Sequence, residues 1–206
     1  MAMTTRKDQT INQYLYEEGL LALEPLYKER QGSTRVHTTR AIHHDPRSVP
    51  GLIKRLASYH CMSLERMRGH YSKLLDKRSY VPLPLGANLV LLPVVFRRSE
   101  ITGETTTGYI NLPRVEQILP PPEPEKQQAD PPLSRVQFQG GYQLNTLNTQ
   151  RTLRERMRQG WQALEDYQSR HYQPQAKHGL RRELVLEALP DCDCVLRDIF
   201  RGMITR

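Results

Sequence analysis

The segment from Tyr80 to Val115 constrains the fold more than any other part of the chain. It holds the longest apolar run, Leu89–Phe96, which only Pro93 interrupts, and a second apolar run at Tyr109–Leu112. Continuous aliphatic and β-branched runs bounded by Gly and Pro are typical of buried strands. Because Pro93 has no backbone N–H to donate, it predicts a bulge, a strand end or an edge position.

The residues between these two runs predict a hairpin, because Ser99–Gly108 is polar, rich in Thr and contains two glycines. A second hairpin is predicted where Arg135–Phe138 and Tyr142–Leu144 flank Gly140 and Gly141. Two adjacent glycines suit a type I′ turn, which needs positive φ at both central positions. Both patterns favour an antiparallel sheet as the core.

Two helices are predicted before this core segment. Ser48 precedes Val49-Pro50, and proline is well placed in the first turn of a helix. After a break at His60–Met62, Ser63 can cap a second helix. The apolar face of the second helix contains Leu64, Met67, Tyr71, Leu74 and Leu75. The basic residues opposite this face or just after it form a candidate phosphate-binding patch, with a solvated surface as the alternative: Arg66, Lys73, Lys77 and Arg78.

A third helix is predicted from Asn148 or Thr149, because apolar residues recur at helical spacing after it. This apolar stripe consists of Leu153, Met157, Trp161 and Leu164. Arg151, Arg154 and Arg158 follow the same period about a quarter-turn to its side. Since the planar guanidinium group binds phosphates and base edges bidentately, these three arginines are the best candidates for nucleic-acid contact. The alternative is that Glu155 and other acids pair with them at the surface.

The patterns together predict an α+β fold, with a small, mainly antiparallel sheet core and flanking amphipathic basic helices. We expect a DNA-binding core at residues 48–172 with a proline-rich insertion at 119–133, and an amphipathic helical tail at 173–206. Residues 1–47 are an N-terminal extension whose membership of the core stays open. Within it, residues 9–28 fit short strands or helical turns, and Thr34–Ile42 fits a strand.

The composition of the chain limits its possible partners and cellular location. The chain has 206 residues and a formal net charge of +8, which attracts phosphate backbones and other anionic surfaces. No apolar run reaches the roughly 18 residues that a membrane span requires, and the N-terminus lacks the apolar centre of a signal peptide. We therefore expect a cytoplasmic, nucleoid-associated protein with no membrane partner. Its 3 cysteines do not make a disulfide framework.

The sequence contains no motif for catalysis, cofactor binding or metal binding. GxSxG, GxxxxGK[ST] and GxGxxG are all missing. The histidines His37, His43, His44, His60 and His70 form no paired zinc-ligand motif, and Cys192-x-Cys194 has no second half. We expect these histidines to be structural or at the surface, and the protein to be a non-enzyme without cofactors.

Several motifs follow one another along the chain. They are Cys61 with a short basic segment, Pro82-Leu83-Pro84 leading to Leu91-Leu92-Pro93, Gly108-Tyr109-Ile110-Asn111, Val136-Gln137-Phe138 with Gly140-Gly141, and the basic helix from Thr149. In these motifs and in their order, roughly residues 50–165 resemble the competence transcription factor (ComK) family of Gram-positive bacteria. The chain departs from the family where MSLERMRGHYSK replaces a Gly/Ser-rich segment, and its proline-rich insertion and Cys-containing tail are atypical.

The resemblance implies an activator that binds A/T-rich double-stranded promoter DNA as a homo-oligomer, largely through the minor groove. It further implies that the protein switches on genes for DNA uptake and is controlled by adaptor-mediated proteolysis. Arginine suits a narrow A/T-rich minor groove, where the electrostatic potential is most negative.

Two other functions compete with DNA-binding regulation. A non-enzymatic adaptor would bind a protein partner through the proline-rich segment Pro120–Pro132 and the helical tail, with the arginines merely solvated. An RNA-binding module would need exposed aromatic side chains on a sheet, for which only Tyr109, Phe138 and Tyr142 qualify.

Overall fold

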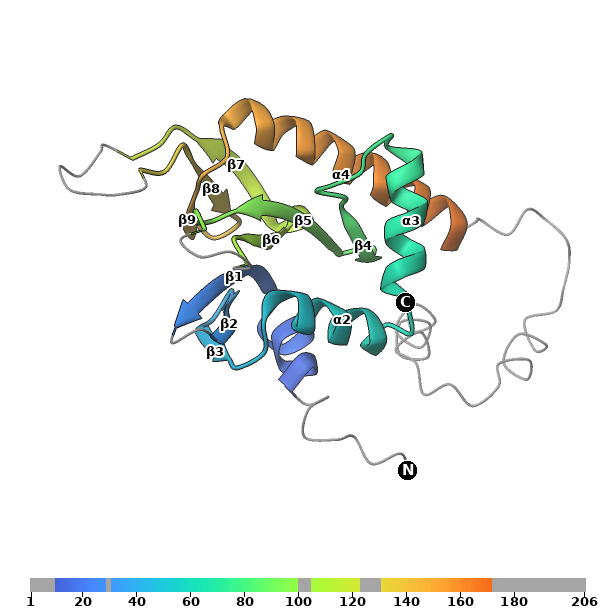
Figure 1. Ribbon diagram of the computed structural model, residues 1–206, viewed down its shortest axis with the longest axis horizontal. Helices are drawn as coiled ribbons and strands as arrows, with labels where there is room; N and C mark the ends of the chain where they lie inside the picture. Colours follow the sequence, from blue (N-terminus) through green and yellow to red (C-terminus); the bar gives the residue numbers. More distant parts are fainter. Residues whose placement is uncertain (1–9, 29–30, 100–104, 123–130, 172–206) are drawn as a thin grey trace, which may run out of the picture.

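The computed structural model describes residues 10–28, 31–99, 105–122 and 131–171, which form two antiparallel sheets and three α-helices (Figure 1). The larger sheet has six strands in the order β3-β2-β1-β6-β5-β4. These strands are β1 (Leu20–Lys28), β2 (Gln31–Thr38), β3 (Ile42–Asp45), β4 (Leu83–Gly86), β5 (Leu89–Val95) and β6 (Thr107–Asn111). The smaller sheet has the order β7-β8-β9 and consists of β7 (Val115–Leu119), β8 (Ser134–Phe138) and β9 (Gln143–Thr146). The predicted α+β fold is confirmed.

The helices cover the sheets from two sides. They are η1, a π-helix (Gln13–Glu17), α2 (Val49–Tyr59), α3 (Leu64–Leu74), η2, a 3₁₀ turn (Leu112–Arg114), and α4 (Gln150–His171). In Figure 1, α4 crosses over β4, β5 and β7, α2 lies on the opposite side, and α3 stands beside the C-terminal half of α4. The helical tail at 173–206 and the middle of the proline-rich insertion, 123–130, lie outside the described residues.

The predicted central hairpin is confirmed, because β5 and β6 pair antiparallel along their length. Pro93 lies opposite Tyr109 of β6 but beyond Leu91, the last residue of β5 that pairs with β4. β5 therefore has no β4 partner at Pro93, which makes this position a local edge, one of the three predicted alternatives. The side chain of Asn111 joins three strands: its Nδ2 donates to the Leu20 carbonyl at 3.0 Å, and its Oδ1 accepts from the Val90 N–H at 3.1 Å.

Residues 20–45 belong to the main sheet, since β1 pairs with β2 on one side and with β6 on the other. Both open alternatives for residues 9–28 occur, a helical turn in η1 and a strand in β1. The single strand predicted at Thr34–Ile42 is wrong in extent. Thr38 ends β2 because its N–H donates to the Ala41 carbonyl at 3.0 Å, which closes a turn before β3 begins.

Both predicted helix starts before the core are confirmed. The Ser48 hydroxyl accepts from the Gly51 N–H, and the Ser63 hydroxyl accepts from the Arg66 N–H. Met67 and Tyr71 are buried, as the apolar face of α3 predicts. The prediction for Leu74 is wrong, because this side chain is 39% exposed. The helix ends at Leu74, and Leu75 packs against the core in its place.

The second hairpin is also confirmed: Gly140 and Gly141 have φ values of 89° and 83° between β8 and β9. Helix α4 begins where predicted, with the Thr149 hydroxyl accepting from the Thr152 N–H at 3.2 Å. Trp161 was assigned to the apolar stripe of α4, and this is wrong, because its side chain is 46% exposed. The buried face is centred instead on Gly160, where an added Cβ would lie 2.5 Å from Leu112 Cδ2.

Glu18 gives the fold an acid-sensitive contact between η1 and the edge of the main sheet. Its carboxylate lies 2.5 Å from His43 Nε2 and accepts from the Thr38 hydroxyl and the Gln13 amide. The hydrogen bond from His43 is the largest of the effects that lower the pKa of Glu18 from 4.5 to about 2. Since this folded-state pKa is depressed, the stabilisation is complete above about pH 4.5 and is lost as the pH falls towards 2.

We therefore expect Glu18→Gln to lower the urea midpoint at pH 7 and to change it much less at pH 2.5. The measurement is urea unfolding of the variant and of the parent protein at both pH values. Glu165→Gln, at an exposed position of α4, is the matched control and should leave the midpoint unchanged at both. An equal loss for Glu18→Gln at both pH values would contradict the assignment.

Candidate nucleic-acid interface

The loop that follows α3 and the first turns of α4 enclose a surface hollow of about 470 Å³, called here the basic hollow. Its walls are residues 76–80 on one side and Arg151, Thr152, Glu155 and Arg156 on the other. The packing of α4 against β4 and β5 places these two segments next to each other, although they are far apart in the sequence. Lys77, Arg78 and Arg151, from two separate predicted patches, therefore share one site.

The hollow is electropositive. Four cations line it, Lys77, Arg78, Arg151 and Arg156, against the two carboxylates of Asp76 and Glu155. Arg78 and Arg151 are exposed, and within the described ranges neither forms an ion pair. Their charges are therefore available to an anion from solution.

The other two arginines of the α4 patch differ in their partners. Arg154 donates to the Gln150 side-chain carbonyl at 3.0 Å, which leaves its charge uncompensated. Arg158 binds the Glu155 carboxylate with two nitrogens, at 3.1 and 2.8 Å, and this contact lowers the pKa of Glu155. Arg158 thus pairs with Glu155 at the surface, which was the alternative to nucleic-acid contact for these arginines. The first two arginines of α4 remain the stronger candidates for phosphate contact.

Arg66 and Lys73 are exposed on α3 and do not line the hollow. Their helix is fixed beside α4 by Asp166, whose carboxylate lies 2.8 Å from His70 Nε2 and 3.0 Å from Arg170 Nε. Although burial favours the neutral acid, these two donors hold the pKa of Asp166 below its ordinary value. The α3 basic residues therefore belong to an element that neighbours the hollow.

Two residues of the hollow, Tyr80 and Arg156, are not among those predicted from the sequence. Arg156 is only 8% exposed, donates to the Pro93 carbonyl at 2.9 Å, and lies 3.9 Å from the centre of the Tyr80 ring. The sequence offers one signal for Arg156: it is three residues after Leu153 and four before Gly160, on the buried face. No local pattern points to Tyr80, because only the tertiary fold places it on Arg156.

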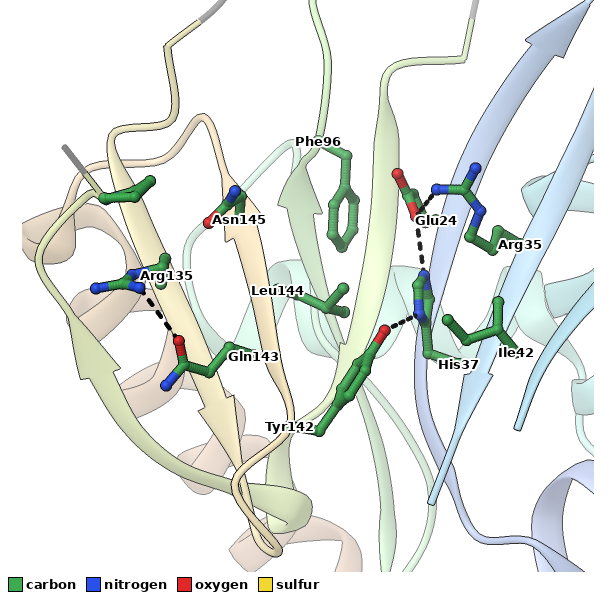
Figure 2. A pocket seen from close by; sticks show the side chains of 11 residues that line it. Glu24, Arg35, His37, Ile42, Phe96, Arg135, Tyr142, Gln143, Leu144 and Asn145 are labelled. Carbon is green, nitrogen blue, oxygen red and sulfur yellow. Dashed lines mark hydrogen bonds and ion pairs between the residues drawn. The ribbon is translucent and has the colours of Figure 1, made fainter. Parts of the chain in front are cut away.

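A second cavity, of about 560 Å³, lies between the two sheets (Figure 2). Glu24 and His37 come from the main sheet, and Tyr142 from the hairpin that leads into β9. His37 is 2% exposed; its Nε2 lies 2.9 Å from Glu24 Oε2, and its Nδ1 lies 2.7 Å from the Tyr142 hydroxyl. Arg35 also contacts the Glu24 carboxylate, at 3.1 Å. This chain of hydrogen bonds fastens the smaller sheet to the larger one.

The order hydroxyl, imidazole, carboxylate is also found in nucleophilic catalysis, but the electrostatics here oppose that role. Burial and the nearby Glu24 charge raise the pKa of Tyr142, so this hydroxyl keeps its proton. Although burial favours the neutral acid, hydrogen bonds from His37 and Arg35 hold the pKa of Glu24 below its ordinary value. A charged Glu24 accepts from His37 Nε2–H, which leaves Nδ1 to accept from Tyr142. The arrangement is a structural contact, as predicted for this histidine.

The described ranges contain no group of three or more His, Cys, Asp or Glu side chains that could hold a metal ion. None of the helices in those ranges is long and apolar enough to cross a membrane. The chain matches no protein-family model, no curated protein and no solved structure. The basic hollow and the residues around it are therefore the features of the protein that bear on its function.

Proposed function

We propose that the protein is a DNA-binding transcriptional regulator that contacts duplex DNA with the basic hollow and the exposed face of α4. The observation that carries this proposal is the convergence of Lys77, Arg78 and Arg151, from distant parts of the chain, around one solvent-open hollow. Cations gathered from separate elements onto one surface are the usual footprint of a phosphate-binding interface.

The exposed arginines of α4 suit an extended polyanion. Arg151 and Arg158 are seven positions apart, with Arg154 between them, which corresponds to about 10 Å along a helix axis. Such a row reaches more than one phosphate. Arg151 and Arg154 can each form two parallel hydrogen bonds to phosphate oxygens, whereas Arg158 would first have to leave Glu155. The hollow extends the row on one side through Arg78 and Lys77.

The aromatic side chains of the two sheets give little support to the RNA-binding alternative. Base stacking on a sheet requires exposed rings, yet Phe138 is fully buried and Tyr109 is partly buried against the core. Tyr142 is bound through its hydroxyl to His37. Phe138 is thus buried and the two tyrosines are partly buried, so none of the three candidates for an RNA-binding sheet is fully exposed.

The finer assignment comes from the resemblance to the competence transcription factor family. It supports a homo-oligomeric activator of DNA-uptake genes that binds A/T-rich promoter sites, acts in the cytoplasm on the nucleoid, and is removed by adaptor-mediated proteolysis. The competing adaptor hypothesis depends on Pro120–Pro132 and on the helical tail, and most of these residues lie outside the described part of the chain.

The test is a fluorescence-anisotropy titration of the full chain with A/T-rich duplex, G/C-rich duplex and single-stranded RNA at two salt concentrations. We expect tight binding to the A/T-rich duplex and a steep loss of affinity with salt, at a log–log slope of roughly −0.9 per phosphate contact. Weak binding to all three nucleic acids would refute the proposal. Equal binding to both duplexes would retain DNA binding and remove the A/T preference.

A further inference from the structure

We propose that Tyr80 is a stacking residue that contacts a base of the bound duplex, with Arg156 as its fixed support. This inference rests on the proposed function and adds to it a contact with a base, beside the contacts with phosphates. Neither residue belongs to the predicted arginine patches, and both line the basic hollow.

The backbone of Tyr80 is held in an unusual conformation. Its φ is 55°, in the left-handed region that bulky side chains rarely adopt. Such positions persist only where the surrounding structure enforces them, and they cluster at binding sites. The ring is nevertheless 40% exposed, so burial of the ring does not explain the conformation. The loop presents an aromatic side chain at the surface.

Arg156 holds the Tyr80 ring in place by contacting one of its faces. Its guanidinium lies 3.9 Å from the centre of the Tyr80 ring, a cation–π contact that covers one face. The guanidinium is itself tied to the Pro93 carbonyl at 2.9 Å and to Asn148 Oδ1 at 3.4 Å. Asn148 in turn accepts from the Val95 N–H at 2.7 Å. Hydrogen bonds of the Arg156 guanidinium therefore connect the Tyr80 ring to β5 and to Asn148, just before α4.

The charged residues around Tyr80 indicate which class of ligand the basic hollow would bind. Arg78 and Arg151 line the same hollow as Tyr80 and lack an ion-pair partner among the residues described. An aromatic ring between cations matches a polymer with alternating anionic and planar groups, as in a nucleic acid. Side chains that enter duplex DNA in this way stack on a base and open one base step. The arginines would contact the flanking phosphates.

Two variants of Tyr80 separate stacking from a structural role. Tyr80→Phe keeps the ring, and Tyr80→Asn removes it while asparagine still tolerates positive φ. We expect Tyr80→Asn to weaken duplex binding roughly tenfold without changing the salt slope, because stacking releases no counterions. Tyr80→Phe should bind within about twofold of the parent protein. Arg151→Ala, in contrast, should reduce the salt slope by about 0.9.

A duplex with one central mismatch gives an independent readout, because a mismatched step is already partly unstacked. The parent protein should bind it more tightly than the matched duplex, and Tyr80→Asn should lose this preference. Thermal melting of each variant checks that the fold is intact. Should Tyr80→Asn fail to fold, the mismatch preference of the parent protein and of Tyr80→Phe decides the question.

The failures of the two proposals are distinguishable. If the parent protein binds no duplex at either salt concentration, the proposed function itself is refuted. If the parent protein binds while Tyr80→Asn binds equally well and the mismatch has no effect, only the stacking role is overturned. A loss of affinity in Tyr80→Asn accompanied by a smaller salt slope would also overturn it, because the ring would then act by positioning the cations.

Discussion

Replacing Arg78 and Arg151 together by alanine is expected to reduce affinity for duplex DNA by at least about a hundredfold. Each arginine would lose a charge-assisted hydrogen bond to a phosphate, a contribution of roughly 1.5–3 kcal/mol. The salt slope should also fall by about 1.8, at roughly 0.9 for each phosphate contact removed. Both side chains are exposed, so the fold should tolerate the change. The measurement is anisotropy at four salt concentrations.

The matched control is Arg40→Ala with Lys54→Ala, which removes the same charge from exposed positions in the β2–β3 turn and on α2. In Figure 1 these elements lie on the side away from α4. The control double variant should change affinity no more than a uniform loss of net charge requires, about threefold. Equal losses in the two double variants would mean that net charge, and no particular surface, attracts the DNA.

Gly108→Ala is expected to destabilise the fold by about 3 kcal/mol, which is at the upper end of the usual cost of overpacking a core. A Cβ at this position of β6 would lie 2.2 Å from the Leu23 carbonyl oxygen and 2.7 Å from the Phe96 ring. The oxygen belongs to β1, in the middle of the sheet, and cannot withdraw without breaking the ladder. Urea unfolding followed by circular dichroism measures the loss.

Gly69→Ala is the control for this substitution, because the same change occurs in α3 with no neighbouring atom within 4 Å of the new Cβ. Alanine should stabilise this exposed helical position by roughly 0.5–1 kcal/mol. The two variants therefore should move the unfolding midpoint in opposite directions. A stable Gly108→Ala protein would contradict the close approach of β1, β6 and Phe96.

Local signals in the sequence predicted the elements whose structure is set locally. Ser48 and Ser63 cap helices with their own hydroxyls, and Gly140 and Gly141 supply the positive φ of their hairpin. The wrong predictions occur where contacts between residues far apart in the sequence determine the structure. Trp161 has the spacing of a core residue, but the close approach of α4 to η2 turns the buried face towards Gly160.

The candidate site was predicted as two separate patches, and sequence alone could not join them. Arg78 and Arg151 share a hollow only because α4 packs on β4 and β5, which no local periodicity encodes. The support of Tyr80 by Arg156 depends on the Pro93 carbonyl of β5, another nonlocal contact. Exposure of single arginines is thus predictable from helical spacing, whereas their assembly into a surface requires the fold.

The pairing of β1 with β6 has a consequence for synthesis of the chain. β1 has a partner on both sides only after β6 has left the ribosome, since Ala22 and Leu23 pair with Ile110 and Tyr109. At about 5–20 residues per second, the apolar residues of β1 wait on the order of ten seconds for that partner. During this interval β2, η1 and α2 can contact β1, but the edge of β1 that later pairs with β6 stays open to other chains. We expect the newly made protein to depend on chaperones or on a low rate of translation, more than its modest size would suggest.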